Sequence, residues 1–367
     1  MIRVDYNYHG HTYRCGHASL IDDEKYILEA VNCGYSKYGF SDHVSVYPFF
    51  YWDKTMRMHD RDVDSYLESI YKLKEKHKYF IDIYAGFEAE YDEVIEKYLC
   101  SLRDKCDYMI LGQHYVLGRD IRHNIDYPIE YAKKVCKAID SGIFDLVAHP
   151  DIFMQFRYNI SDDDMEEYLE NCIIASKMIC IKAKEVDIPL EVNLGGFFSR
   201  DIELEPRYPT KLFWDIVREN NNKVVIGIDA HQRNDIPLAT LKLDLLSDFI
   251  DFDKLNILKD YDPVVYRKNN SKLSSLYQST KDSLTSVEAR IISSFNSRED
   301  LIRGLRTIPN HKGIKSKYFD CITFFKREEL IRVIKKCPDK DIVSFVDEYY
   351  SKKKKDKNKI KQKVKER

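Results

Sequence analysis

Seven short apolar runs alternate with segments of helical length over the first 245 residues of this chain, and this rhythm restricts the possible folds more than any other feature. Several runs are continuously apolar, as expected for strands that helices cover on both faces. Seven such units predict a parallel α/β fold and favour a barrel over an open sheet. The expected strands are Arg3–Tyr8, Lys37–Ser41, Phe80–Phe87, Tyr108–Gly112, Phe144–Ala148, Pro189–Leu194 and Val224–Ile228. The expected helices are Asp22–Asn32, Asp62–Lys76, Asp92–Leu102, Pro128–Ile139, Asp162–Lys184, Thr210–Glu219 and Leu238–Leu246.

The rhythm stops near residue 250, where the composition changes. Residues 265–290 are rich in Ser, Lys and Asn, and helical patterns recur at Arg327–Lys336 and Asp339–Tyr350. Residues 351–367 have a net charge of +8, so the whole chain's net charge of −2 leaves −10 for the rest. We expect a barrel at residues 1–248, a mostly helical extension at 249–350 and a flexible basic tail at 351–367. The tail is expected to be a solvated helix end, with nucleic-acid contact as the alternative.

The composition favours a globular protein of the cytoplasm. Apolar residues make up 44% of the chain, which is enough for a sizeable core. No apolar run approaches the ~20 residues that span a bilayer, and the first residues lack the apolar segment of a secretory signal. The nine cysteines are odd in number and show no CxxC spacing, which argues against a disulfide framework. The mildly acidic body does not suit a nucleic-acid surface, and no membrane contact is expected.

Chemically active side chains follow the ends of six of the seven expected strands. In a parallel barrel, functional residues lie at the carboxyl ends of the strands. Seven of the 11 histidines fall at these points. One histidine alone is more often a surface or packed residue, but seven in phase with strand ends indicate a common site. The residues at these points include His9, His11, His17, Asp42, His43, Glu88, His114, His149, Asp229 and His231.

The spacing of these residues indicates a metal site. In His9-x-His11 and Asp229-x-His231, the paired side chains share one face of a strand because side chains alternate with a period of two. Imidazole and carboxylate ligands suit Zn, Fe and Mn, so they do not distinguish among these metals. Seven imidazoles and two strong carboxylate candidates exceed the needs of one four- or five-coordinate ion. The sequence therefore predicts a site with more than one ion, with a carboxylate bridging two of them.

The order of these residues resembles that of the PHP (polymerase and histidinol phosphatase) metallohydrolase family over about residues 1–240. The family pattern is His-x-His, a His after the second strand, a Glu, two isolated His and then Asp-x-His. Every position of this pattern is filled in the present chain. Three segments are similar to the histidinol-phosphatase branch, namely His9-Gly10-His11-Thr12 with Cys15-Gly16-His17-Ala18, Leu190-Glu191-Val192-Asn193, and Arg207-Tyr208-Pro209-Thr210.

The resemblance implies a distorted (β/α)7 TIM-like barrel, the PHP domain, with three metal positions that would hold two to three divalent metal ions. The implied ligands are His9, His11, Glu88 and Asp229 for the first ion, Glu88, His114 and His149 for the second, and His17, His43 and His231 for the third. Glu88 would bridge the first two ions. Asp42 either orients a ligand or caps a helix, and Cys15 is more simply a packed residue than a ligand.

The resemblance also implies an activity, the hydrolysis of a small phosphate monoester by metal-activated water. Glu88, Asp229 and His231 are the expected catalytic residues, and Asp229 or His231 would assist proton transfer. The leading interpretation is a histidinol-phosphate phosphatase of histidine biosynthesis.

The substrate-binding residues are less closely matched to the family. Arg157, Arg200 and Asn193 on the mouth loops are expected to bind substrate, since arginine suits bidentate phosphate contacts. Residues 194–200 depart from the pattern of the histidinol-phosphatase branch, which leaves the substrate open. The alternatives are a phosphoesterase of the same family that acts on a nucleotide, a phosphotyrosine or a nucleic-acid end, and a metal-binding module without catalysis. Modules without catalysis usually lack ligands, whereas every ligand position is filled here.

Overall fold

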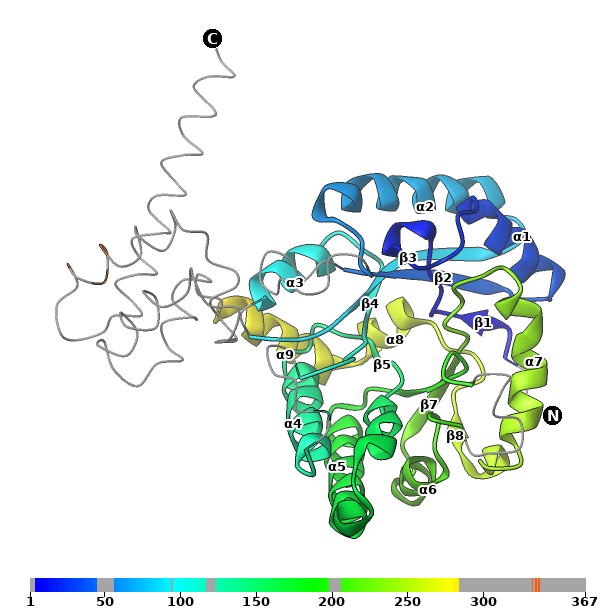
Figure 1. The fold of residues 1–367 in the computed structure, drawn as a ribbon. Helices are drawn as coiled ribbons and strands as arrows, with labels where there is room; N and C mark the ends of the chain where they lie inside the picture. The colour runs from blue at the N-terminus through cyan, green and yellow to red at the C-terminus, as the bar shows by residue number, and fades with distance from the viewer. Residues whose placement is uncertain are drawn as a thin grey trace.

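The computed structural model describes residues 4–44, 56–93, 95–116, 122, 124–197 and 206–283, together with Arg332, Ile334 and Lys336. All seven expected strands are present within these residues, and consecutive strands pair in parallel (Figure 1). They are β1 (Tyr6–Asn7), β2 (Lys37–His43), β3 (Asp82–Ala89), β4 (Tyr108–Leu111), β5 (Leu146–Val147), β6 (Leu190–Asn193) and β7 (Lys223–Gly227). The sheet curls on itself, which confirms the expected TIM-like α/β barrel.

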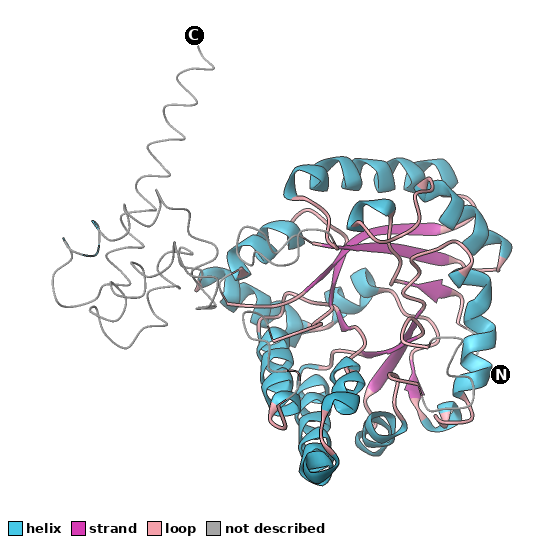
Figure 2. Cartoon of the chain, in the orientation of Figure 1, coloured by secondary structure: helices cyan, strands magenta, loops and turns pink. Residues whose placement is uncertain are grey.

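Helices surround the curled sheet (Figure 2). The seven expected helices are α1 (Asp23–Asn32), α2 (Val63–His77), α3 (Glu96–Arg103), α4 (Tyr127–Asp140), α5 (Met165–Val186), α6 (Lys211–Asn220) and α7 (Asp235–Leu246). Helix α6 illustrates how they pack, because Phe213, Trp214 and Val217 are buried and recur at helical spacing. In α6 the periodicity that predicted the helix therefore also fixes the face that it turns inward.

Tyrosine rings fill much of the barrel interior. The ring centroid of Tyr8 lies 5.3 Å from that of Tyr84 and 5.6 Å from that of Tyr108, both in edge-to-face contact. The Tyr108 hydroxyl lies 2.7 Å from the carbonyl oxygen of Tyr8, which gives this buried phenol the partner it needs. The high tyrosine content of the chain is thus used partly in the core.

The barrel closes differently at its two ends. At the carboxyl ends of the strands, the Ala230 carbonyl accepts a hydrogen bond of 2.8 Å from the His11 amide, so the segment after β7 pairs directly with the segment after β1. At the opposite end, an eighth strand that the sequence rhythm did not predict, β8 (Asn256–Ile257), pairs with β7. The Tyr6 hydroxyl then donates to the Leu258 carbonyl, at 2.7 Å. The barrel is therefore seven-stranded where the candidate site lies and is widened by β8 at the other end.

The segment after residue 248 packs against the barrel as far as residue 283. It contains β8, α8 (Pro263–Asn269) and α9 (Ser271–Asp282). Tyr261 is buried, and its ring contacts those of Tyr6 and Tyr8. The Asp262 side chain accepts hydrogen bonds from two amides in the first turn of α8 and so caps that helix. Residues 249–283 thus pack against the amino-terminal end of the barrel and extend its core there.

The division of the chain at residues 248 and 350 stays a prediction. The sheet continues into β8, beyond residue 248, while most of the expected helices Arg327–Lys336 and Asp339–Tyr350 and the whole basic tail at 351–367 lie outside the described residues. Among the residues that the structure describes, no helix is long and apolar enough to cross a membrane.

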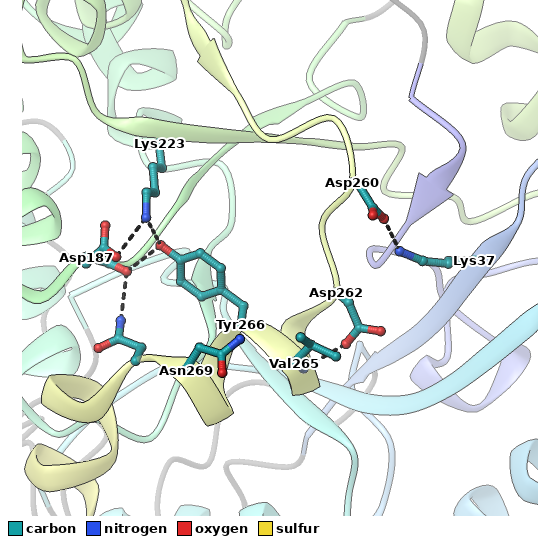
Figure 3. A pocket seen from close by; sticks show the side chains of 9 residues that line it. Lys37, Asp187, Lys223, Asp260, Asp262, Val265, Tyr266 and Asn269 are labelled. Carbon is teal, nitrogen blue, oxygen red and sulfur yellow. Dashed lines mark hydrogen bonds and ion pairs between the residues drawn. The ribbon is translucent and has the colours of Figure 1, made fainter.

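A polar pocket of about 410 Å³ lies at the amino-terminal end of the barrel (Figure 3). On one side, the Lys223 ammonium contacts the Asp187 carboxylate at 2.8 Å and the Tyr266 hydroxyl at 3.0 Å. On the other, Lys37 pairs with Asp260. Each lysine therefore pairs with a carboxylate, so the two positive charges in this pocket are balanced. Among the residues that line the pocket, no group of ligand-type side chains lies close enough together to hold a metal ion.

Candidate metal centre

The Glu88 carboxylate, on β3, lies at the centre of a group of imidazoles at the carboxyl ends of the strands. Its oxygens lie 2.9 Å from His149 Nε2, 3.0 Å from His43 Nδ1 and 3.2 Å from His9 Nε2. His11 Nε2 and His114 Nε2 follow at 3.4 and 3.5 Å. Four strands besides β3 thus deliver imidazoles around one buried carboxylate.

Asp229 forms the centre of a second group. Its Oδ1 atom lies 3.1 Å from His11 Nε2, 3.4 Å from His9 Nε2 and 3.3 Å from His231 Nδ1. The ligand atoms of His9, His11 and Asp229 all lie within 4.8 Å of one another, which is close enough to hold one ion. The structure therefore brings together three of the four residues expected at the first metal position around Asp229, and Glu88 borders them.

A third group joins His17, His43 and His231, whose ligand atoms also lie within 4.8 Å of one another. These are the residues expected at the third position. His43 also lies beside Glu88, so the third group is contiguous with the group around Glu88. For the second position, His149 and Glu88 cluster with His9, while His114 lies at the edge of the group.

The backbone is strained at two of these residues. His149 and Asp229 have φ angles of +29° and +56°, which are unusual for residues other than glycine. Such strain persists only where the surroundings fix it, and it is common at functional sites. Gly112 shows how tightly the site is built, because a Cβ atom there would lie 1.8 Å from Glu88 Oε1.

Glu191, on β6, orients two of the candidate ligands. Its carboxylate lies 2.9 Å from His9 Nδ1 and accepts hydrogen bonds from the His149 amide (3.2 Å) and Asn193 Nδ2 (2.9 Å). The sequence assigned no site role to Glu191. The signal was the spacing Glu191-x-Asn193 on a strand, which places both side chains on one face as in His9-x-His11.

Glu90 and Asp42 hold other parts of the site. Glu90 Oε1 lies 2.9 Å from His114 Nδ1 and pairs with Arg57. Asp42 accepts hydrogen bonds from the Thr12 amide and hydroxyl, and its Oδ1 atom lies 3.9 Å from His11 Nδ1. Asp42 therefore fixes the turn after β1, and it also borders a candidate ligand.

The donor set fits divalent metal ions. Several buried atoms have no hydrogen-bond partner among the described residues, namely both nitrogens of His11, His43 Nδ1, His149 Nδ1, His231 Nε2 and Asp229 Oδ1. Burial lowers the pKa of His11 to about 3 and that of His43 well below its usual value, so both imidazoles are neutral, the form that binds metal. Burial would raise the pKa of Glu88, but the surrounding imidazoles hold it well below its usual range. Buried lone pairs without donors are costly unless a cation binds them.

A pocket of about 650 Å³ opens onto these groups. Its lining includes His17, His43, His114, Asp229 and His231, the aromatic residues Tyr115, Phe197 and Tyr208, and the cations Arg57 and Lys242. A small phosphate ester would therefore reach the candidate ligands directly.

The three expected substrate-binding residues are placed differently. Arg157 does not line this pocket, and its guanidinium donates to the carbonyl oxygens of Met154 and Arg207, both at 3.1 Å. Asn193 is buried, and it donates to Glu191 and accepts a hydrogen bond from the Gly195 amide at 2.8 Å. Arg200 lies outside the described residues. Substrate contact by these residues stays a prediction.

The fold and the strand-end groups define a parallel α/β barrel with a candidate multinuclear metal centre. The solved structures that share this fold include the following two. One, from Listeria monocytogenes and named for histidinol phosphatase hisK, is 21% identical, with a TM-score of 0.51, over 63% of this chain and 97% of that chain. The other, histidinol phosphate phosphatase (HISK) from Lactococcus lactis complexed with Zn, L-histidinol and phosphate, is 16% identical, with a TM-score of 0.51, over 69% and 95%. No protein-family model matches the sequence, and a search of curated proteins finds no similar sequence.

Proposed function

We propose that this chain is a metal-dependent phosphomonoesterase of the PHP family and that its substrate is L-histidinol phosphate. The observation that carries this proposal is the buried Glu88 carboxylate among five imidazoles, two of which, His43 and His114, line an open pocket. Its structural neighbours support the substrate, because one of them is described in complex with Zn, L-histidinol and phosphate.

The metal ligands in this proposal follow the three groups of side chains. His9, His11, Glu88 and Asp229 would hold one ion, Glu88, His114 and His149 a second, and His17, His43 and His231 a third. When bound, divalent ions activate water near neutral pH and neutralise charge on phosphoryl oxygens. The partly exposed pocket walls would admit the ester from solvent.

The chain's own residues would orient the ions and move protons. Glu191 would keep His9 in the orientation that turns Nε2 toward Glu88, through the contact at Nδ1. Asp229 and His231 both line the pocket, so either can exchange a proton with the leaving oxygen there.

A nucleotide monophosphate is the second candidate substrate. Tyr115, Phe197 and Tyr208 line the pocket, and aromatic rings are the usual stacking surface for bases. A panel assay separates the two candidates. Metal-free protein is reloaded with Zn, Mn or Fe and assayed with histidinol phosphate, nucleoside monophosphates and phosphotyrosine. The proposal expects the highest kcat/KM for histidinol phosphate, and a clear preference for a nucleotide would replace it with the second candidate.

A further inference from the structure

Lys242 lines the pocket but does not belong to any of the groups of candidate metal ligands. It lies on the face of α7 that also carries Asp235 and Leu238, and all three residues line the 650 Å³ pocket. Their spacing of three and four residues places them one above another on the helix. Lys242 therefore belongs to the pocket wall beside Asp229 and Gly195.

The Lys242 ammonium uses only part of its hydrogen-bonding capacity among the described residues. Nζ donates one hydrogen bond, of 2.9 Å, to the Leu194 carbonyl oxygen. An ammonium has three donors, and among the described residues Lys242 forms no ion pair with a carboxylate. Burial lowers the pKa of Lys242, although the charges of Asp235 and Asp229 oppose this effect.

Two arginines near the site, Arg57 and Arg157, already have protein partners. Arg57, also in the pocket lining, pairs with Glu90. Arg157 donates to backbone carbonyl oxygens outside the lining. Among the described residues no carboxylate pairs directly with Lys242, and Asp235 Oδ2 instead accepts the amides of His231 and Gln232, both at 2.9 Å. A half-buried positive charge with spare donors in a pocket is a binding group for an anion.

We propose that Lys242 binds a phosphate oxygen of the substrate and of the released inorganic phosphate. This inference rests on the proposed phosphomonoesterase function and identifies the side chain that holds the phosphate end. It assigns to α7 the role that the sequence gave to Arg157 and Arg200. The competing explanation is purely structural: Lys242 would only tie α7 to the loop after β6 through Leu194.

Binding of inorganic phosphate to the metal-loaded protein tests this inference without requiring turnover. Isothermal titration calorimetry compares the wild type with Lys242→Met, Lys242→Arg and a control, Lys254→Met. Lys254 pairs with Asp251 on the surface and does not line the pocket. We expect Lys242→Met to raise the phosphate Kd about tenfold or more, since hydrogen bonds to charged groups are the stronger ones. Lys242→Arg should keep part of the affinity, and Lys254→Met should keep all of it.

Steady-state kinetics add a readout that a structural tie would not give. Lys242→Met should raise KM for a phosphomonoester by a similar factor while kcat changes less than about twofold. An unchanged phosphate Kd, or a loss of affinity explained by an equal loss of bound metal, would overturn the inference. If the wild type binds phosphate through Lys242 but hydrolyses no ester, the inference stands and the proposed function fails. If the wild type binds no phosphate, the inference itself fails.

Discussion

Replacing Glu191 with glutamine should weaken metal binding without unfolding the barrel. The carboxylate is buried and meets three donors, His9 Nδ1 at 2.9 Å, Asn193 Nδ2 at 2.9 Å and the His149 amide at 3.2 Å. Glutamine keeps one acceptor oxygen but turns an NH2 group toward at least one of these donors. Loss of such a supporting carboxylate typically costs about 10- to 100-fold in metal affinity, or about 1.4–2.7 kcal/mol.

The retained oxygen places Glu191→Gln near the lower end of this range and Glu191→Ala near the upper end. Competition with a chromophoric zinc chelator measures the affinity, and elemental analysis counts the ions that remain. Only ions bound through His9 and His149 should be weakened, while the group of His17, His43 and His231 should keep its ion. The exposed surface variant Glu185→Gln serves as the control. A Glu191→Gln protein with wild-type affinity at every site would refute the reasoning.

Three further perturbations test the site, the barrel end and the partly buried ion pair of Glu93 with Lys134. Gly112→Ala should lower kcat/KM by about a hundredfold, because the new Cβ would lie 1.8 Å from Glu88 Oε1 and displace it. Tyr261→Ala should lower the free energy of unfolding by about 3 kcal/mol or more, measured in urea, because the ring is buried in the barrel end. For Glu93, burial would raise the pKa, but the Lys134 ammonium outweighs burial and holds it below its usual range. That stabilisation is present above the unfolded carboxyl pKa and is lost as pH falls, so Glu93→Gln should destabilise the fold at neutral pH and less at about pH 3.5.

Each of these predictions has a control or a result that would contradict it. Tyr79→Ala, at a side chain that is 85% exposed, should leave the unfolding free energy nearly unchanged. Unaltered activity of the Gly112→Ala variant would contradict the first prediction, because it would show that displacing the Glu88 carboxylate does not affect catalysis. A Glu93→Gln effect that is equal at both pH values would show that the ion pair contributes nothing.

The sequence predicted the main elements of the fold because periodicity is a local signal. Each of the seven expected strands and of the seven helices expected before residue 248 is present, including two-residue strands such as β1 and β5. Strand β8 was missed, because Asn256–Ile257 is too short to show a pattern and forms by pairing with Lys223 and Val224 of β7. Its existence depends on tertiary contacts, such as that between Tyr6 and Leu258, which local periodicity does not contain.

The candidate ligands were predictable for a similar reason. Histidines at strand ends must converge once the strands form a barrel, so their positions follow from the fold. Glu191 and Lys242 were not identified, because Glu191 acts through His9 and Lys242 reaches the pocket from a helix rather than from a strand end. Arg157 was assigned to the substrate from its position on a loop, whereas its hydrogen bonds to the carbonyl oxygens of Met154 and Arg207 come from folding.

The most direct test of the central proposal is to measure bound metal and phosphatase activity on the same preparation. The protein is purified without oxygen, its ions are counted by elemental analysis, and kcat/KM is measured for histidinol phosphate and other phosphomonoesters. The proposal predicts two to three ions per chain, hydrolysis that is lost on chelation and restored by divalent ions, and a preference for histidinol phosphate. Fewer than two ions, or full activity after chelation, would contradict it.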